Sequence, residues 1–265
     1  MKLPTIDPAF RWSEERWGLG LRCRELEPTA QHLFSTRQLQ LRNPDTSGPN
    51  EAAWAEAAAA VGVSADRIVR IKQVHGNTVR VIRNGLAEKL HERPAADAVI
   101  SNHPGLALAV QVADCVPVLL VDPTTGAAGA IHAGWRGTNV RISAATVEAM
   151  RRELNVEPPN LLAAIGPSIG ACCYEVGSEV FDAFRQIATD GDVSRWFSRS
   201  PGGSLHLDLW AANRDQLVAA GLRPDRIFVA GLCTLTHADL FDSYRAAGKN
   251  TGRMAALVTV PHAIE

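Results

Sequence analysis

The sequence predicts an α+β protein with layered, mixed sheets in a single domain. Two kinds of segment follow one another without a regular order: short runs rich in Val, Ile and Ala, and longer stretches with helical character. This irregular order argues against a doubly wound sheet or a parallel barrel, because both need strict alternation of strand and helix. Since 46% of the 265 residues are hydrophobic, the chain can also bury a large core.

The domain organisation follows from what the chain lacks. No internal repeat, low-complexity tract or block of charge interrupts it, so we expect one domain. The only plausible linker lies before Gln31. We therefore expect residues 1–30 to be an N-terminal extension and residues 31–265 to form the domain.

Helices are predicted where helical propensity or a helical period is clear. Residues 51–61 are rich in alanine and stop at Gly62, as a helix with a glycine after its end would. In a second segment Ile142, Val147 and Met150 lie near one helical face. With this segment, the further predicted helices cover residues 140–154, 179–187 and 209–220.

Strands are predicted where Val, Ile and Ala gather between glycines or prolines. Such runs are too short and too apolar for surface helices, so they are typical of buried strands. The predicted strands cover residues 67–73, 78–82, 106–112, 116–121 and 127–132.

Composition narrows the class of protein. The formal net charge of -1 and the pI near 6.7 give no reason to expect nucleic acid or a membrane surface as a partner. We find no run of about 18 apolar residues and no secretory signal at the start. Five scattered cysteines, an odd number, do not suggest a disulfide framework. We expect a cytoplasmic protein.

Three residues at strand ends have side chains that suit a metal ion. His75 ends one apolar segment, Cys115 begins a second, and His132 ends a third. Two imidazoles and a thiolate would suit zinc and leave a fourth position open, as in a catalytic site. The spacings of 40 and 17 residues are long, however, so an inert buried thiol and two hydrogen-bonded histidines remain an alternative.

Two glycine-containing loops could contact a ligand. After His132 the chain turns through Gly134 into a predicted helix, so Arg136 and the backbone up to Gly137 could bind an anion such as phosphate. The alternative is a plain tight turn in which Arg136 pairs with a carboxylate. In the second loop Tyr174 and Glu175 could touch a ligand or could only brace the loop.

Taken together, these motifs resemble the bacterial laccase-domain proteins, once named multicopper polyphenol oxidases and later assigned as purine nucleoside phosphorylases with adenosine deaminase activity. The matching segments follow the order and spacing of that family between about residues 34 and 258. They include 73–76 (QVHG), 96–98 (ADA), 113–118 (ADCVPV), 132–137 (HAGWRG), 165–170 (IGPSIG), 174–177 (YEVG) and 251–255 (TGRMA).

The resemblance implies both a fold and a metal site. It implies a compact α/β/β/α sandwich, present as a monomer or weak homodimer, and one zinc ion held by His75, Cys115 and His132. Copper is less suitable, because a multicopper site needs many clustered histidines. It further implies that substrate-binding residues come from the matching segments: Arg37, Gln73, Arg136, Gly137, Tyr174 and Glu175. The segment after Arg37 departs from the family pattern, which bears on substrate preference.

The activity that the resemblance implies is phosphorolysis of adenosine, inosine and guanosine, with methylthioadenosine as a further substrate, together with deamination of adenosine. Asp114 and Glu175 are candidates for proton transfer, although Asp114 should face away from its neighbour Cys115 in an extended strand. One alternative is a cysteine hydrolase or amidase acting on a cell-wall precursor, with Cys115 as nucleophile and His132 or His75 as base. Others are a non-catalytic metal-binding protein and, least favoured, a polyphenol oxidase.

Overall fold

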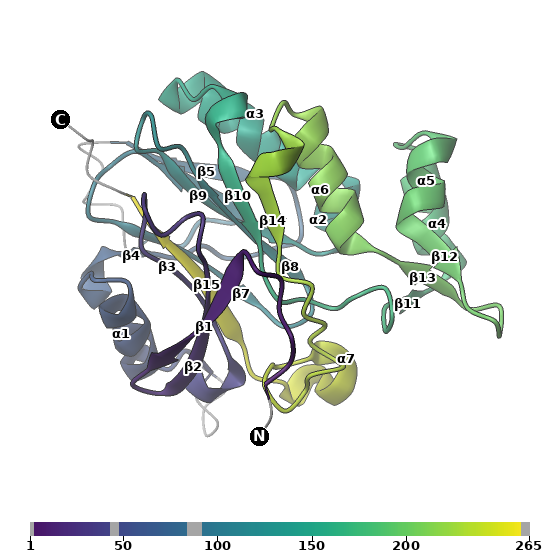
Figure 1. The fold of residues 1–265 in the computed structure, drawn as a ribbon, viewed down its shortest axis with the longest axis horizontal. Helices are drawn as coiled ribbons and strands as arrows, with labels where there is room; N and C mark the ends of the chain where they lie inside the picture. The colour runs from purple at the N-terminus through teal and green to yellow at the C-terminus, as the bar shows by residue number, and fades with distance from the viewer. Residues whose placement is uncertain (1–2, 43–47, 84–91, 261–265) are drawn as a thin grey trace.

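The structure is a computed structural model that describes residues 3–42, 48–83 and 92–260. Two six-stranded sheets lie face to face, and helices cover their outer sides, so the predicted α+β fold with an α/β/β/α arrangement is confirmed (Figure 1). Both sheets are mixed, since each contains parallel and antiparallel strand pairs.

The first sheet has the strand order β1-β2-β3-β15-β7-β4. Its strands are β1 (Phe10–Glu15), β2 (Gly18–Cys23), β3 (His32–Ser35), β15 (Met254–Thr259), β7 (Ala107–Val112) and β4 (Ile68–Val69). The outer face packs against α1 (Glu51–Ala60), which presents Trp54 and Ala57 to the sheet.

The second sheet has the order β14-β10-β8-β9-β6-β5. Its strands are β14 (Ile227–Val229), β10 (Leu162–Ile165), β8 (Val116–Val121), β9 (Ala128–Ala133), β6 (Ala98–Ser101) and β5 (Val79–Ile82). Its outer face is covered by α3 (Ile142–Leu154) and α6 (Leu209–Ala219) (Figure 1).

The remaining elements form a smaller group at one end of the molecule and short connections elsewhere (Figure 1). The group contains α4 (Ser178–Arg185), α5 (Asp190–Trp196) and a three-stranded sheet of β11 (Glu175–Val176), β13 (Leu205–Leu207) and β12 (Phe197–Arg199). Two short helices, α2 (Trp135–Asn139) and α7 (Tyr244–Ala247), lie close to the ends of the large sheets. Short 3₁₀ turns cover Arg37–Leu39, Ala65–Arg67, Pro158–Asn160, Pro224–Arg226 and Gly248–Asn250.

Strand β8 shows why the middle strands are apolar without interruption. Every residue from Val116 to Val121 is buried. Leu119 and Val121 belong to the core between the sheets, whereas Val118 and Leu120 belong to the core under the helices. Because successive side chains of a strand point to opposite faces, a strand covered on both faces needs hydrophobic residues at every position.

The segment expected as an N-terminal extension is part of the first sheet over much of its length. Residues 10–23 contain β1 and β2, which pair with each other and, through β2, with β3. Phe10, Leu21 and Leu26 are almost completely buried in the core between the sheets. The inter-sheet core therefore includes side chains that precede Gln31.

Two predicted elements differ from the structure. The predicted strand 67–73 is wrong over most of its length, since only Ile68–Val69 pairs with β7. After Val69 the hydrogen bonds between the two backbones end. The side-chain amide of Gln73 instead donates to the backbone oxygen of Gln111 and accepts from its backbone N–H. The predicted helix 140–154 agrees with α3 to within two residues, but the segment before it, expected as a glycine turn, contains the separate short helix α2. Arg141, which has a left-handed backbone with φ of 60°, lies between the two helices. No helix of the described residues is long and apolar enough to cross a membrane.

Candidate metal and nucleoside site

The structure brings His75, Cys115 and His132 together at one edge of the molecule's central sheets. Their ligand atoms all lie within 4.8 Å of one another, and Cys115 Sγ is 3.9 Å from His75 Nε2. Cys115 immediately precedes β8 and His132 lies in β9, and these two strands are antiparallel neighbours. His75 reaches them from the loop between β4 and β5 with a left-handed backbone at φ of 62°.

Asp97 holds two of these three residues in position. Its carboxylate accepts hydrogen bonds from the backbone N–H groups of His75 at 2.9 Å and Gly76 at 2.7 Å. It is also 2.9 Å from Nδ1 of His132, which donates to it. Nε2 of His132 is therefore left for the group formed with Cys115 and His75. A carboxylate that orients a histidine in this way is typical of metal sites.

The thiolate of Cys115 and the imidazolium of His132 stabilise each other's charge. Burial disfavours both charged forms, but the attraction between thiolate and imidazolium lowers the pKa of Cys115 to about 6 and raises the pKa of His132 to about 9. Burial also opposes ionisation of Asp97, but the hydrogen bonds from His132 and the backbone lower its pKa. A thiolate is the form of cysteine that binds metal ions.

Gly134 provides space for this group. A Cβ atom at position 134 would lie 2.9 Å from Cys115 Sγ and 3.0 Å from His75 Cδ2. The backbone of a residue without a side chain therefore lines the place where the sulfur and the two rings converge. With two imidazoles, one thiolate and this space beside them, the three residues fit a single metal ion.

A cavity of about 700 Å³ opens beside the three residues. Its wall is formed by residues of both large sheets and of the C-terminal part of the chain. These residues are far apart in the sequence, so no single sequence motif contains them. Besides the three residues named above, the lining includes Ile71, Gln73, Gln111, Ala113, Asp114, Gly134, Trp135, Arg136, Ile169, Tyr174, Leu209, Tyr244, Arg245 and Arg253. A cavity of this size can enclose a small organic ligand.

Three arginines make the cavity a favourable place for an anion. Arg136 lies over the ring of Trp135 at 4.3 Å, and Arg245 lies over the ring of Tyr174 at 5.3 Å. Neither they nor Arg253 forms an ion pair with any carboxylate in the described part of the chain. Guanidinium groups without an acidic partner can bind phosphate through paired hydrogen bonds.

The residues expected to bind substrate are not all at the cavity. Gln73, Arg136 and Tyr174 line it. Gly137 is buried within α2, where a Cβ atom would lie 3.2 Å from the backbone oxygen of Gly76. Glu175 has an exposed side chain, and its backbone oxygen accepts from Arg245.

Arg37 and Asp114 have other partners. The guanidinium of Arg37 donates to the backbone oxygen of Ala238 at 2.6 Å, and Arg37 is not among the lining residues. Asp114 lines the cavity, but one carboxylate oxygen accepts from Thr234 and the other from the backbone N–H of Arg245, both at 2.6 Å. These bonds occupy the carboxylate that was considered for proton transfer.

Sequence reasoning did not assign roles to Asp97, Gln111, Tyr244, Arg245 and Arg253. The signal for Asp97 was an acidic residue placed between Ala96 and the apolar strand β6, where an unpaired carboxylate would be costly. Nothing local marks Gln111 or Arg245 as cavity residues, because their positions depend on how distant elements pack.

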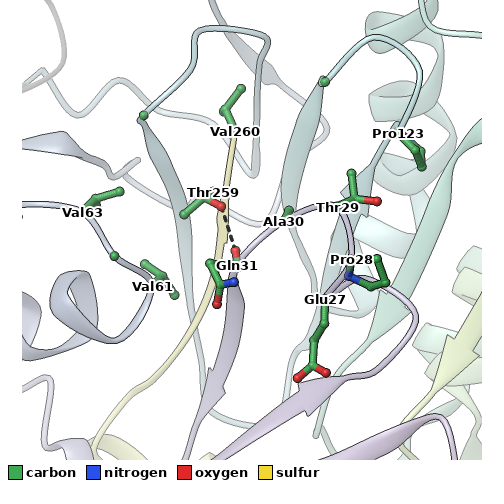
Figure 2. A pocket seen from close by; sticks show the side chains of 13 residues that line it. Glu27, Pro28, Thr29, Ala30, Gln31, Val61, Val63, Pro123, Thr259 and Val260 are labelled. Carbon is green, nitrogen blue, oxygen red and sulfur yellow. Dashed lines mark hydrogen bonds between the residues drawn. The ribbon is translucent and has the colours of Figure 1, made fainter. Parts of the chain in front are cut away.

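A second cavity, of about 440 Å³, lies elsewhere on the molecule (Figure 2). Of the described residues that line it, only Glu27 has an ionisable side chain, and Glu27 pairs with Arg11 at 2.6 Å. The side-chain hydroxyl of Thr259 donates to the backbone oxygen of Gln31 at 3.1 Å (Figure 2). This cavity offers no group for catalysis, so the chemistry of the described residues concentrates at the first one.

Comparison with known proteins shows which family this chain resembles. A profile of the family described as multi-copper polyphenol oxidoreductase laccase matches residues 26–261. A crystal structure of a hypothetical protein, YfiH of Bacillus licheniformis, superposes with a TM-score of 0.84 at 28% identity, covering 96% of this chain and all of that one.

Similar proteins of named activity are also found. A purine nucleoside phosphorylase of Deinococcus radiodurans is 42% identical over 207 residues, which cover 78% of this chain and 76% of that protein. A purine nucleoside phosphorylase of Bacteroides thetaiotaomicron is 40% identical over 65% of this chain, and the match spans 63% of that relative, just under two thirds of its length. A protein named adenosine deaminase RL5, from an unknown prokaryotic organism, is 39% identical over 73% of this chain and 75% of its own length.

Proposed function

The chain belongs to the multi-copper polyphenol oxidoreductase laccase family, and from this premise we propose that it is a zinc-dependent purine nucleoside phosphorylase that also deaminates adenosine. The proposed substrates are adenosine, inosine and guanosine, with methylthioadenosine as a further one. The observation that supports it best is a metal-suited group at the wall of a cavity lined by three arginines that form no ion pair within residues 3–42, 48–83 and 92–260.

Zinc is proposed as the metal, held by His75, Cys115 and His132. A set of one thiolate and two imidazoles is typical of catalytic zinc, whereas a multicopper site would need further histidines nearby. When bound, zinc supplies Lewis acidity, which lowers the pKa of water and polarises groups on the substrate. Asp97 keeps His132 in the tautomer that offers Nε2.

The arginines are proposed to bind the phosphate that attacks the ribose. In phosphorolysis a phosphate oxygen forms a bond to C1′ while the bond from C1′ to N9 breaks, and its electron pair goes to the base, which takes up a proton. Positive charge develops on the ribose during this step. Arg136, Arg245 and Arg253 would hold the phosphate dianion near C1′ and so lower the cost of bringing the reactants together.

Aromatic side chains at the same cavity suit a purine. Trp135, Tyr174 and Tyr244 line it, and their faces can stack on a planar base. Burial raises the pKa of Tyr174, so its hydroxyl stays protonated and can donate a hydrogen bond. In deamination, water adds at C6 of the same base and ammonia leaves, so one base-binding position would serve both reactions.

Incubation of the purified protein with adenosine, with and without phosphate, tests this proposal. Separation of the products by chromatography should show adenine and ribose 1-phosphate only when phosphate is present, and inosine in both samples. Absence of every product, with metal bound and the protein folded, would contradict the proposal.

A cysteine amidase is the second candidate, because Cys115, His132 and Asp97 also have the order of a nucleophile, a base and an orienting carboxylate. Metal removal separates the two functions. Activity on nucleosides should disappear with a chelator and return with zinc, whereas an amidase would cleave an amide substrate without metal and lose activity on alkylation of Cys115.

A further inference from the structure

A second group of sulfur atoms lies outside the cavity. The sulfur atoms of Cys172, Cys173 and Cys233 all lie within 4.8 Å of one another, and we name this group the thiol cluster. None of the three cysteines lines the cavity described above. All three are free thiols.

The backbone brings these sulfurs together from two distant loops. Neighbouring residues of an extended strand point in opposite directions. Cys172 and Cys173, however, lie in a turn whose N–H at position 173 donates to the backbone oxygen of Gly170, so their sulfur atoms are only 3.5 Å apart. Cys233 comes from the loop after β14, which is joined to the first loop by a bridge between Ser168 and Cys233.

Exposure and donors of the thiol cluster suit a soft metal ion. Cys233 is 4% exposed, Cys173 is half-buried and Cys172 is exposed. An ion could therefore enter from solvent on the side of Cys172 and bind Cys233 on its buried side. The hydroxyl of Thr236 lies 3.4 Å from the sulfur of Cys173 and 3.7 Å from that of Cys172, so an oxygen donor is available beside the sulfur atoms. Thiolate ligands select Cu⁺ and Zn²⁺ over harder ions.

We propose that the thiol cluster is a second metal site, which binds one thiophilic d¹⁰ cation, Cu⁺ or Zn²⁺, through three sulfur atoms. Each thiol gives its proton to solvent when the ion binds, and no oxidation is needed. Three donors alone suit Cu⁺, whereas Zn²⁺ would add Thr236 or water as its fourth ligand. This proposal does not depend on the proposed function.

Binding at the thiol cluster would also brace the cavity wall. Ile169 and Tyr174 line the cavity and flank the two adjacent cysteines along the chain. An ion held jointly by Cys172, Cys173 and Cys233 would fasten this loop to the loop after β14. We therefore expect ion binding at the thiol cluster to raise the unfolding temperature of the full chain.

The test uses Cd²⁺ as a spectroscopic probe on the full chain, stripped of metal and kept reduced without oxygen. The wild type should bind two equivalents, and Cys115→Ser should keep one equivalent with a strong sulfur-to-cadmium absorption. The double variant Cys172→Ser, Cys173→Ser should lose the second equivalent or bind it at least roughly tenfold more weakly. Cys23→Ala is the matched control, because Cys23 is a buried thiol of β2 in the inter-sheet core, and it should bind both equivalents.

X-ray absorption on Cys115→Ser loaded with Cu⁺ or with Zn²⁺ then counts the sulfur neighbours. Three sulfurs with Cu⁺, or three sulfurs and one oxygen with Zn²⁺, would support the proposal, and competition between the two ions identifies the preferred one. Unfolding temperatures of the double variant without metal show whether it folds. The proposal is overturned if Cys115→Ser binds no equivalent, or if the folded double variant binds as many equivalents as the wild type with unchanged affinity.

Discussion

At the scale of single residues, Gly134 is the position where one added carbon atom should matter most. In Gly134→Ala the new Cβ would lie 2.9 Å from the sulfur of Cys115 and 3.0 Å from Cδ2 of His75, so at least one of these two ligands must shift from its place. The backbone itself accepts alanine, since φ at this position is -73°. We expect bound metal and nucleoside turnover to fall at least roughly tenfold while the circular dichroism spectrum stays unchanged.

Metal analysis and initial rates measure this effect. Gly202→Ala is a suitable control, because only the Ser200 hydroxyl lies near the added Cβ, at 3.8 Å. Full metal content in Gly134→Ala would show that the three residues do not need the space beside Gly134.

Asp97 should control metal affinity without touching the metal. In Asp97→Asn the amide cannot accept all the hydrogen bonds that His75, Gly76 and His132 donate to the carboxylate. We expect zinc affinity to decrease by about 10- to 100-fold, measured by competition with a chelator. Asp122→Asn is the matched control, because Asp122 is equally buried but bonds only within the turn after β8. Equal zinc affinity for the two variants would refute the role of Asp97.

Arg136 should separate the two proposed reactions, because only phosphorolysis needs phosphate. In Arg136→Met the cavity loses one guanidinium that has no carboxylate partner among the described residues. We expect the KM for phosphate to rise roughly tenfold, whereas the rate of inosine formation from adenosine changes little. Arg152→Met, on the exposed face of α3, is the control for a lost surface charge. An equal loss of both reactions in Arg136→Met would instead point to a general effect on the cavity.

At the scale of elements, strands covered on both faces were the easiest to predict. The prediction for 116–121 coincides with β8, because both neighbouring cores demand hydrophobic residues. The prediction for 67–73 failed because this apolar segment leaves the sheet after Val69. Ile71 and Gln73 then line the cavity instead of pairing with a strand. The break between α2 and α3 was missed, since nothing in the sequence marks Arg141 as left-handed.

The contact that replaces the missing part of this strand should have a measurable energy. Gln73 donates to the backbone oxygen of Gln111 at 2.7 Å and accepts from its N–H at 2.8 Å. Gln73→Met would leave both groups without these partners, so we expect the free energy of unfolding to fall by about 1–3 kcal/mol. Urea denaturation measures it, with the exposed Gln186→Met as control. A variant as stable as the wild type would mean that water replaces both bonds without cost.

At the scale of the whole molecule, the candidate site lies where the two large sheets meet. Gln111 is the last residue but one of β7 in the first sheet, Cys115 stands directly before β8 of the second, and Arg253 directly before β15 of the first. The metal-suited residues could be proposed from their chemistry and from the family resemblance. Arg136 could also be proposed, from the glycine turn after His132, and it does line the cavity. Arg245 and Arg253 could not, because they reach this cavity from segments more than a hundred residues further along the chain.

The stability of this packing should depend on pH through His32. Its ring is fully buried in β3, where Nε2 accepts from the backbone N–H of Cys23 at 2.7 Å and Nδ1 donates to the backbone oxygen of Ala30 at 3.1 Å. Burial lowers the pKa of His32 from 6.5 to about 4, so the folded state keeps this ring neutral.

The unfolded chain therefore binds a proton at His32 between pH 6.5 and about 4 that the folded chain does not bind. The free energy of unfolding is therefore undiminished by His32 above pH 6.5 and decreases as the pH falls through this window. The total decrease from this one group is about 3 kcal/mol. Urea denaturation at several pH values should show a steeper loss for the wild type than for His32→Gln, which keeps an amide donor and acceptor but has no titratable group. Because all other ionisable groups are common to both proteins, parallel stability curves would show that His32 is protonated within the fold.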